Sequence, residues 1–389
     1  MYPRLSDLIN DFLGTDILLP IQTYGFFVAL AFVTGGYILY LELGRKERQG
    51  LIQAQTKTIT KHKAPAISEY IISAALYFII GFKGMGMIFQ YQYFANHPQD
   101  YLLSWQGNWW GGILISLAAV VYLFIKAKKN SNRKTQTEEV LFHAKELTPA
   151  IVLVAALTGI LGAKIFDLVE HLDSFFRDPL GTLFSFSGLT FYGGLIVAAF
   201  AVAWYGERNK IKWPLIADSV APALMLAYAI GRIGCQLSGD GCWGIPNLEP
   251  KPEWLAFLPD WMWSFTFPHN VIKEGVPIVG CHGDFCYELG QPVFPSSFYE
   301  TTLSLIFFMV LWSIRKRIVL PGALFAIYLM MNGTERFFIE FIRVNIQYSW
   351  LGIGASQAQF IAVGIFLAGA LGLVYFIFIN KNKTTTKIK

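Results

Sequence analysis

The chain has 389 residues, 54% of them hydrophobic and only 15% charged. A soluble protein of this length would carry about a quarter charged residues, so the composition excludes a soluble globular domain. The net charge of +5 gathers in a few loops, which indicates membrane topology rather than nucleic-acid binding.

Nine apolar segments follow one another, each about long enough to cross the hydrocarbon core as a helix. Backbone groups in lipid must be hydrogen-bonded internally, and the alternating pattern of barrel strands is absent. We therefore predict an all-α polytopic membrane protein, with 44–66 and 126–149 as solvated linkers. The segments are 21–43, 67–93, 111–126, 150–170, 188–205, 214–230, 297–314, 320–340 and 357–380.

Lysine and arginine mark alternate loops of this pattern. They gather after the first and third segments, in the turn at 206–212, at 315–317 and in the tail, whereas the loop 94–110 has none. The positive-inside rule then predicts an N-terminus outside and a C-terminus in the cytoplasm. An odd number of spans agrees with this orientation, which leaves the segment 231–296 outside.

All four cysteines fall in this outer segment. An even number of cysteines on the oxidising side predicts disulfides, with three possible pairings. A metal site that uses Cys281, His282 and Cys286 is the alternative, although its spacing fits no common ligand pattern, and we expect no metal. The cysteines are Cys235, Cys242, Cys281 and Cys286.

Polar residues recur at the outer ends of five of the segments. Arg336 and Glu340 are four residues apart and Arg343 follows after three more, so we expect all three on one helical face. Ionisable groups within spans usually face a partner or a cavity, and guanidinium groups suit phosphate. The pattern predicts a site for a phospholipid head group. Its members are Tyr24, Tyr192, Gly193, Gly194, Arg232, Tyr299, Glu300, Arg336, Glu340 and Arg343.

Each of these residues also has a purely structural interpretation. Arg336 and Glu340 could be a helix-stabilising pair, and Arg343 could extend to the interface. Tyr24 and Tyr192 could belong to the aromatic belt, and the glycines could serve only close helix contact. Asp218, in the sixth segment, is expected to hydrogen-bond a neighbouring helix.

The stretch "GRIGCQLSGDGCWG" resembles the signature of the prolipoprotein diacylglyceryl transferases. Residues 231–234 match directly, whereas Cys235 and Ser238 stand where the family has asparagine. Asp240 replaces a glutamate, and one extra residue precedes the Trp-Gly that ends at Gly244.

Further motifs carry the resemblance from residue 21 to about 375. Tyr24 matches a tyrosine of the first span, while Tyr192 replaces the histidine of a His-Gly-Gly motif. "PSSFYE" matches an element that contains Tyr299 and Glu300. "NGTERFFIEFIR", which begins at Asn332, supplies Arg336, Glu340 and Arg343, and Gln359 fits a late glutamine.

The family implies seven spans, so the hairpin at 67–126 is expected to be an insertion into a single membrane domain over 1–389. The resemblance implies transfer of the diacylglyceryl group of phosphatidylglycerol to the lipobox cysteine of a lipoprotein precursor. A thioether forms and glycerol-1-phosphate leaves. We expect no cofactor, no nucleic-acid partner, a monomer, and a bacterial inner-membrane location with the site towards the periplasm.

The chemistry assigns roles to five residues. Arg232 and Arg336 are expected to hold the phosphate, and Glu340 to orient Arg336. Asp240 would hold either Arg232 or the glycerol hydroxyls. Tyr192 is either the proton acceptor for the thiol or an aromatic group that positions it.

The remaining site residues are expected to bind the two substrates. Two other functions stay open: a transporter or flippase of an anionic amphiphile, and an inactive relative that only binds precursors. The predicted substrate-binding residues are Tyr24, Gly193, Gly194, Cys235, Ser238, Gly244, Tyr299, Glu300, Asn332, Arg343 and Gln359.

Overall fold

The computed structural model describes residues 1–61, 66–96, 98–131, 136–184, 190–345, 347–350 and 353–386. These residues form two compact units. Unit 1 contains residues 1, 24–54 and 143–389, and unit 2 contains residues 2–23 and 55–142. Both units are mainly helical, which confirms the predicted all-α class.

Seven described helices are long and apolar enough to cross a membrane. The other two expected spans are helices of 18 and 17 residues, Phe191–Arg208 and Ala323–Ile339, so the count of nine and the orientation stay predictions. Residues 188 and 189, the expected start of the fifth span, lie outside the described chain. The seven are Thr23–Arg48, Ile67–Phe89, Trp109–Lys129, Ala144–Glu170, Trp213–Ser238, Ser296–Ile314 and Gln357–Phe378.

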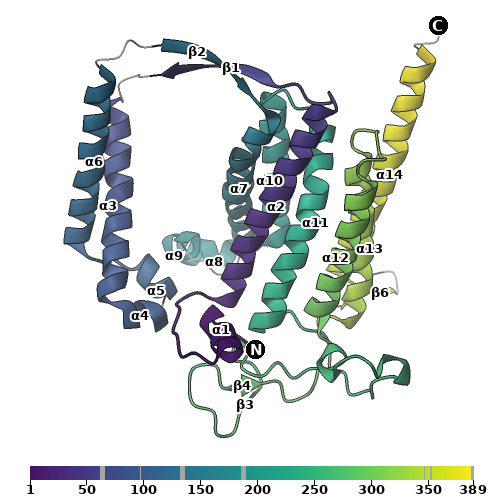
Figure 1. Ribbon diagram of the computed structural model, residues 1–389. Helices are drawn as coiled ribbons and strands as arrows, with labels where there is room; N and C mark the ends of the chain where they lie inside the picture. The colour runs from purple at the N-terminus through teal and green to yellow at the C-terminus, as the bar shows by residue number, and fades with distance from the viewer. Residues whose placement is uncertain are drawn as a thin grey trace. The chain divides into compact units, whose positions relative to one another are not determined.

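The helices of unit 1 pack in neighbouring pairs (Figure 1). α7 packs on α10, α11 on α12, and α13 on α14, while α11 also contacts α10 and α13. The helices are α2 (Thr23–Arg48), α7 (Thr148–Glu170), α8 (Leu172–Arg177), α9 (Pro179–Phe184), α10 (Phe191–Arg208), α11 (Trp213–Ser238), α12 (Ser296–Ile314), α13 (Ala323–Ile339) and α14 (Gln357–Thr386), with short 3-10 turns η1 (Ala144–Leu147), η2 (Glu253–Leu255), η3 (Asp260–Met262) and η4 (Glu340–Ile342).

α11 is the most buried of the candidate spans. Pro214 lies in its first turn, where a missing N–H costs no helical hydrogen bond. Its middle joins a core with α12 and α13 that contains Ala221, Met225 and Leu311. Gly239 ends the helix in the left-handed conformation, with φ 64°, so the chain turns sharply into the outer segment.

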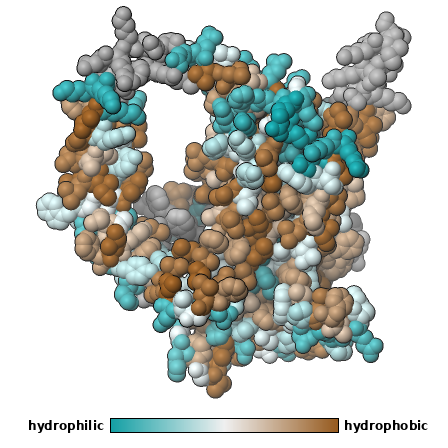
Figure 2. All heavy atoms as spheres, in the orientation of Figure 1, coloured by the Kyte–Doolittle hydropathy of each residue, from teal (hydrophilic) through white to brown (hydrophobic). Residues whose placement is uncertain are grey.

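Large apolar side chains remain exposed along the helices. Phe200 is 75% exposed and Leu371 69%. Figure 2 shows such brown side chains along the helices of the face drawn. Exposed apolar surface of this extent fits a lipid environment.

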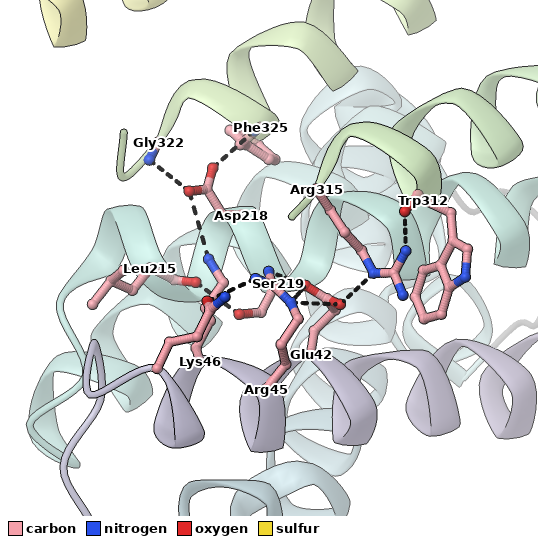
Figure 3. Close-up of polar contacts among 11 residues, drawn as sticks. Glu42, Arg45, Lys46, Leu215, Asp218, Ser219, Trp312, Arg315, Gly322 and Phe325 are labelled. Carbon is pink, nitrogen blue, oxygen red and sulfur yellow. Dashed lines mark hydrogen bonds and ion pairs between the residues drawn. The ribbon is translucent and has the colours of Figure 1, made fainter. Parts of the chain in front are cut away.

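One charged group joins α2, α11, α12 and α13 at the ends where α11 and α13 begin (Figure 3). We call it the Glu42–Asp218 cluster; its members are Glu42, Arg45, Lys46, Asp218 and Arg315. Glu42 pairs with Arg45 at 2.6 Å and with Arg315 at 2.9 Å.

Asp218 completes the cluster by linking three elements. Lys46 Nζ lies 3.6 Å from its carboxylate. The backbone N–H groups of Gly322 and Phe325 donate to it at 2.8 and 2.9 Å. Asp218 thus satisfies the free amides at the start of α13, which confirms its expected hydrogen bond to a neighbouring helix.

The segment between α11 and α12 is compact. Trp243, Phe267, Leu289 and Val293 form its small core. Strands β3 (Val276–Pro277) and β4 (Tyr287–Glu288) pair antiparallel within it. Beyond α13, β5 (Gln347–Trp350) and β6 (Ile353–Ser356) also pair antiparallel.

Unit 2 is built around one helical hairpin. α3 and α6 pack along each other, and Gly81 and Gly111 lie at their contact. The elements are α1 (Leu5–Leu13), β1 (Gln55–Lys61), α3 (Ile67–Phe89), α4 (Tyr91–Asn96), α5 (Pro98–Leu103), α6 (Trp109–Ser131) and β2 (Gln136–Phe142).

The prediction that 44–66 and 126–149 are plain linkers is wrong in part. β1 and β2 pair antiparallel, with Gln55 opposite Phe142 and Lys61 opposite Gln136. β1, "QTKTITK", has threonine at every second position and an isoleucine between two of them, a composition that favours strands. The pairing joins residues far apart in sequence, so neither linker could reveal it alone.

Candidate active site

The predicted arginines converge on a single carboxylate, Glu300, in the first turns of α12. Its side chain is fully buried. Arg232 Nε lies 2.6 Å from one oxygen, and terminal nitrogens of Arg343 and Arg336 lie 3.1 and 3.6 Å from the other. With Glu340, these residues form what we call the Glu300 cluster. One carboxylate shared by three guanidinium groups leaves positive charge available for an anion.

The start of α12 is tied to the loop after α11. Ser296 and Ser297 donate their hydroxyls to the carbonyl of Cys242, at 2.7 and 2.9 Å. Both serines are buried. These bonds fix Glu300, one turn later, against Arg232 of α11.

Glu340 holds Arg336, as predicted. Their closest atoms lie 3.1 Å apart. Glu340 also accepts a hydrogen bond from Ser356 at 2.7 Å and one from Asn345. Gln359 accepts from the backbone N–H of Ser356 at 3.0 Å, so it supports Glu340 through Ser356.

The expected shared helical face of Arg336, Glu340 and Arg343 is wrong for Arg343. α13 ends at Ile339, and Arg343 follows a 3-10 turn in extended conformation, with φ −89° and ψ 152°. Its side chain nevertheless reaches Glu300, and only 17% of it is exposed, which excludes the interfacial alternative. Burial is the largest single influence and acts to lower the pKa of Arg343, but the Glu300 carboxylate, with Cys242 and Tyr228, raises that pKa overall.

Gly244 lies beside this extended stretch. It forms an antiparallel bridge with Arg343, and the N–H of Ile245 donates to Ile342 at 2.8 Å. A Cβ on Gly244 would collide with the carbonyl of Ile342 and lie 2.9 Å from Phe294 Cβ. Glycine is therefore required for the backbone approach that places Arg343.

Asp240 does not fill the first of its two predicted roles, which was to hold Arg232. Arg232 takes Glu300 as its ion-pair partner. Asp240 follows the left-handed Gly239 and accepts the backbone N–H of Cys242 at 3.1 Å. The second role, binding glycerol hydroxyls, remains a prediction.

The prediction that all four cysteines form disulfides is wrong. Cys281 and Cys286 are bonded to each other, which also removes their sulfurs from any metal site. Cys235 and Cys242 are free thiols. Cys235 is buried on α11 whereas Cys242 lies beyond the Gly239 turn, a placement that an even cysteine count cannot reveal.

The two free thiols lie close to Asp240. Ligand atoms of Cys235, Asp240 and Cys242 are within 4.8 Å of one another, a spacing that could hold a soft metal ion. A hydrogen bond from Cys235 lowers the pKa of the Cys242 thiol. A terminal nitrogen of Arg232 lies 4.0 Å from Cys235 Sγ, so the thiols border the Glu300 cluster.

Tyr24 and Ser238 lie near the same end of α11. Tyr24 is 44% exposed and within electrostatic range of Cys235, Asp240 and Arg232. A Cβ on Gly234 would lie 3.5 Å from the backbone of Tyr24. Ser238 is buried and donates to the carbonyl of Cys235 at 3.5 Å.

Tyr192, Gly193 and Gly194 open α10. A Cβ on Gly193 would lie 2.8 Å from the carbonyl of Gly162, and one on Gly194 would lie 2.8 Å from that of Gly159. Both glycines thus serve the close packing of α10 on α7, the structural alternative. Tyr192 is half-buried in the first turn of α10, and its role stays a prediction.

Tyr299 and Asn332 complete the predicted set. Tyr299 directs its hydroxyl to the carbonyl of Met262 at 2.8 Å, so it fastens the outer segment to α12. Asn332 lies one turn before Arg336 on α13.

Sequence reasoning missed two residues. Tyr228 lies one turn before Arg232, whose guanidinium is 5.1 Å from the Tyr228 ring. Glu335, next to Arg336, is only 3% exposed. A carboxylate within a predicted span was a signal for Glu335, but its neighbour Arg336 suggested a simple charge pair.

The fold and the site together define a class: a polytopic membrane protein with a buried arginine cluster suited to an anionic head group. A sequence model of the family "Prolipoprotein diacylglyceryl transferase" matches residues 110–375. The chain belongs to this family.

Relatives that carry the name phosphatidylglycerol–prolipoprotein diacylglyceryl transferase include the following three. The protein of Leptospira interrogans is 24% identical over 332 residues, covering 72% of this chain and 93% of its own. That of Chlorobaculum tepidum is 28% identical, covering 69% and 84%. That of Bordetella bronchiseptica is 27% identical, covering 69% and 90%.

Proposed function

We propose that this chain transfers the diacylglyceryl group of phosphatidylglycerol to the lipobox cysteine thiol of lipoprotein precursors. The product is a thioether, and glycerol-1-phosphate is released. Family membership and the names of the relatives support the reaction. The observation that carries it is the convergence of Arg232, Arg336 and Arg343 on the buried Glu300.

The arginines keep donors for a phosphate while they contact Glu300. Arg232 meets Glu300 through Nε, which leaves its terminal nitrogens for other groups. Arg336 divides its two terminal nitrogens between Glu300 and Glu340, and each of these nitrogens keeps a second N–H for another acceptor. We assign Arg232 and Arg336 to the phosphate and Glu340 to the orientation of Arg336.

The reaction is a displacement at carbon. The thiolate attacks the glyceryl carbon next to the phosphate ester oxygen, and that carbon–oxygen bond breaks with its electrons going to the phosphate. Fixed cations in a site that excludes water stabilise the charge that develops on the leaving group. A free thiol has a pKa of about 8.5, so a proton acceptor must also be supplied.

Other residues around the cluster are assigned to substrate binding. We assign Asp240 and Ser238 to the glycerol hydroxyls, and Tyr24 and Tyr192 to the acceptor side. We place the protein, as a monomer, in the bacterial inner membrane with this site towards the periplasm. The hairpin at 67–126 is proposed as an addition to the family core, since only its residues from 110 on fall within the family match.

Depletion complementation tests the function directly. Bacterial cells depleted of their own transferase and given this gene should recover lipidated lipoproteins, detected by a mobility shift and mass spectrometry. Failure at normal expression would favour an inactive relative that binds precursors. Movement of phosphatidylglycerol between leaflets without thioether formation would favour the transporter alternative.

A further inference from the structure

A buried carboxylate next to the Glu300 cluster has no assigned role. Glu335 lies just before the last turn of α13 and is 3% exposed. Within the described chain neither of its oxygens has a hydrogen-bond partner. Glu300 and Glu340, by contrast, are both held by arginines.

Leaving a carboxylate buried and unpaired is unfavourable for folding. Such groups persist mainly where function uses them. The neighbours of Glu335 are those of the active site: Glu300 of α12, Arg232 of α11, Arg336 beside it and Arg343 beyond α13. Two tyrosines, Tyr228 and Tyr328, are also within its electrostatic range.

The paired members of this group are three arginines and two glutamates, Glu300 and Glu340, which leaves one positive charge. A phosphodiester anion on the arginines brings the group to neutrality. An ionised Glu335 would then be the one uncompensated carboxylate beside it, so uptake of a proton by Glu335 is favoured in a site of low polarity.

We propose that Glu335 is the proton acceptor for the substrate thiol, an inference that rests on the proposed function. The S–H proton passes to a Glu335 oxygen as the sulfur attacks the glyceryl carbon. The carbon–oxygen bond breaks and glycerol-1-phosphate leaves with the electron pair. Its phosphate then takes the proton from Glu335, so the site returns to its starting charge.

Two of the described histidines are paired with carboxylates elsewhere. His143 lies 2.6 Å from Glu47, and His171 lies 3.2 Å from Asp167. Phenols in general are weak proton acceptors near neutral pH. Glu335 is adjacent to Arg336 in sequence and within electrostatic range of Arg232 and Arg343, the arginines near which we place the leaving group.

The test uses the full chain in nanodiscs with phosphatidylglycerol and a lipobox peptide. Glu335→Gln keeps the shape of the side chain and removes the acceptor. We expect kcat to fall by about 10²- to 10⁴-fold with KM for the lipid unchanged. Glu253→Gln, which changes an exposed glutamate of η2, is the matched control and should keep wild-type activity.

Two readouts separate proton transfer from a structural role. A peptide with selenocysteine in place of the acceptor cysteine ionises below neutral pH, so it needs no acceptor and should restore most of the Glu335→Gln rate. The same variant should melt at or above the wild-type temperature, because a neutral amide replaces an unpaired buried carboxyl group. Glu335→Asp should be partly active with cysteine and nearly normal with selenocysteine.

Three results would overturn the proposal. In the first, Glu335→Gln turns over at the wild-type rate while Arg232→Ala is inactive. This result rejects Glu335 as the proton acceptor and keeps the proposed function. Another is loss of activity with both peptides together with a lower melting temperature, which indicates a structural role. Inactivity of the wild type with both peptides removes the proposed function and this inference together.

Discussion

Two charged clusters lie at opposite ends of the same three helices, α11, α12 and α13. They differ in how their carboxylates are paired. In the Glu42–Asp218 cluster each carboxylate is fully engaged: Glu42 by two arginines, Asp218 by Lys46 and two backbone amides (Figure 3). In the Glu300 cluster three arginines share Glu300. Where each carboxylate has its own partners, the cluster stabilises helix ends. Where three arginines share one carboxylate, some of their N–H donors stay available for a phosphate.

Changing Arg232, in the Glu300 cluster, should cause the largest loss of transfer activity. Arg232→Ala should reduce transfer by about 10³-fold, because a donor aimed at the developing phosphate charge is lost. Arg232→Lys should fail as well, since a planar fork becomes a point charge. Transfer to a lipobox peptide in nanodiscs measures both.

Arg45→Ala is the matched control in the other cluster. It removes an arginine from Glu42, which keeps Arg315, so turnover per folded molecule should hardly change. Normal transfer by either Arg232 variant at normal expression would contradict the assignment of this arginine to phosphate.

Asp218→Ala should damage the fold rather than the chemistry. It leaves Lys46 buried without its carboxylate and frees the amides of Gly322 and Phe325. We expect a loss of stability of about 3 kcal/mol, the usual effect of breaking a buried pair. Thermal unfolding in detergent, followed alongside transfer activity, checks this.

The informative result is whether Asp218→Ala changes the melting temperature or the transfer activity. Folded Asp218→Ala protein should keep its KM for phosphatidylglycerol. An unchanged melting temperature combined with lost transfer would mean that the Glu42–Asp218 cluster takes part in catalysis.

Tyr192 gives a smaller effect. With Glu335 as proton acceptor, Tyr192→Phe should keep most of its activity and the same pH profile, whereas Tyr192→Ala should lose activity through poor positioning of the thiol. Transfer rate against pH for both variants measures this. A fall of about 10²- to 10⁴-fold in Tyr192→Phe would instead restore the phenol as the proton acceptor.

The smallest effect concerns the thiols beside Arg232. The pKa of Cys242 is lowered by its hydrogen bond from Cys235, so Cys242 carries more thiolate at neutral pH than an ordinary cysteine. Its alkylation by iodoacetamide should therefore begin at lower pH, and Cys235→Ala should shift that onset upward. Mass spectrometry of tryptic peptides follows the modification.

Cys281 and Cys286 serve as internal controls in that experiment. They are bonded to each other and should stay unmodified until a reductant is added. Protection of Cys242 before reduction would indicate that it is oxidised with Cys235.

Much of the architecture follows from local composition. Long apolar runs had to become helices, because lipid offers the backbone no other hydrogen-bond partners. The motif residues Arg232, Arg336 and Glu300 were also found from sequence, since charged groups at the ends of apolar runs are costly without a function. The contact between Arg336 and Glu340 followed from helical spacing alone.

Only the tertiary structure decided which groups meet. Glu300 was predicted as one substrate-binding residue among several, yet it is the centre of the cluster, because α11, α12 and α13 bring residues from 232 to 343 together. The end of α13 at Ile339 moved Arg343 off the expected face. After the turn at Gly239, Asp240 accepts the backbone N–H of Cys242, and Arg232 pairs with Glu300 instead. Helical period and charge predict contacts only between residues close in sequence. Ion pairs between helices depend on where each helix ends and on which side chains then lie within about 4 Å of each other.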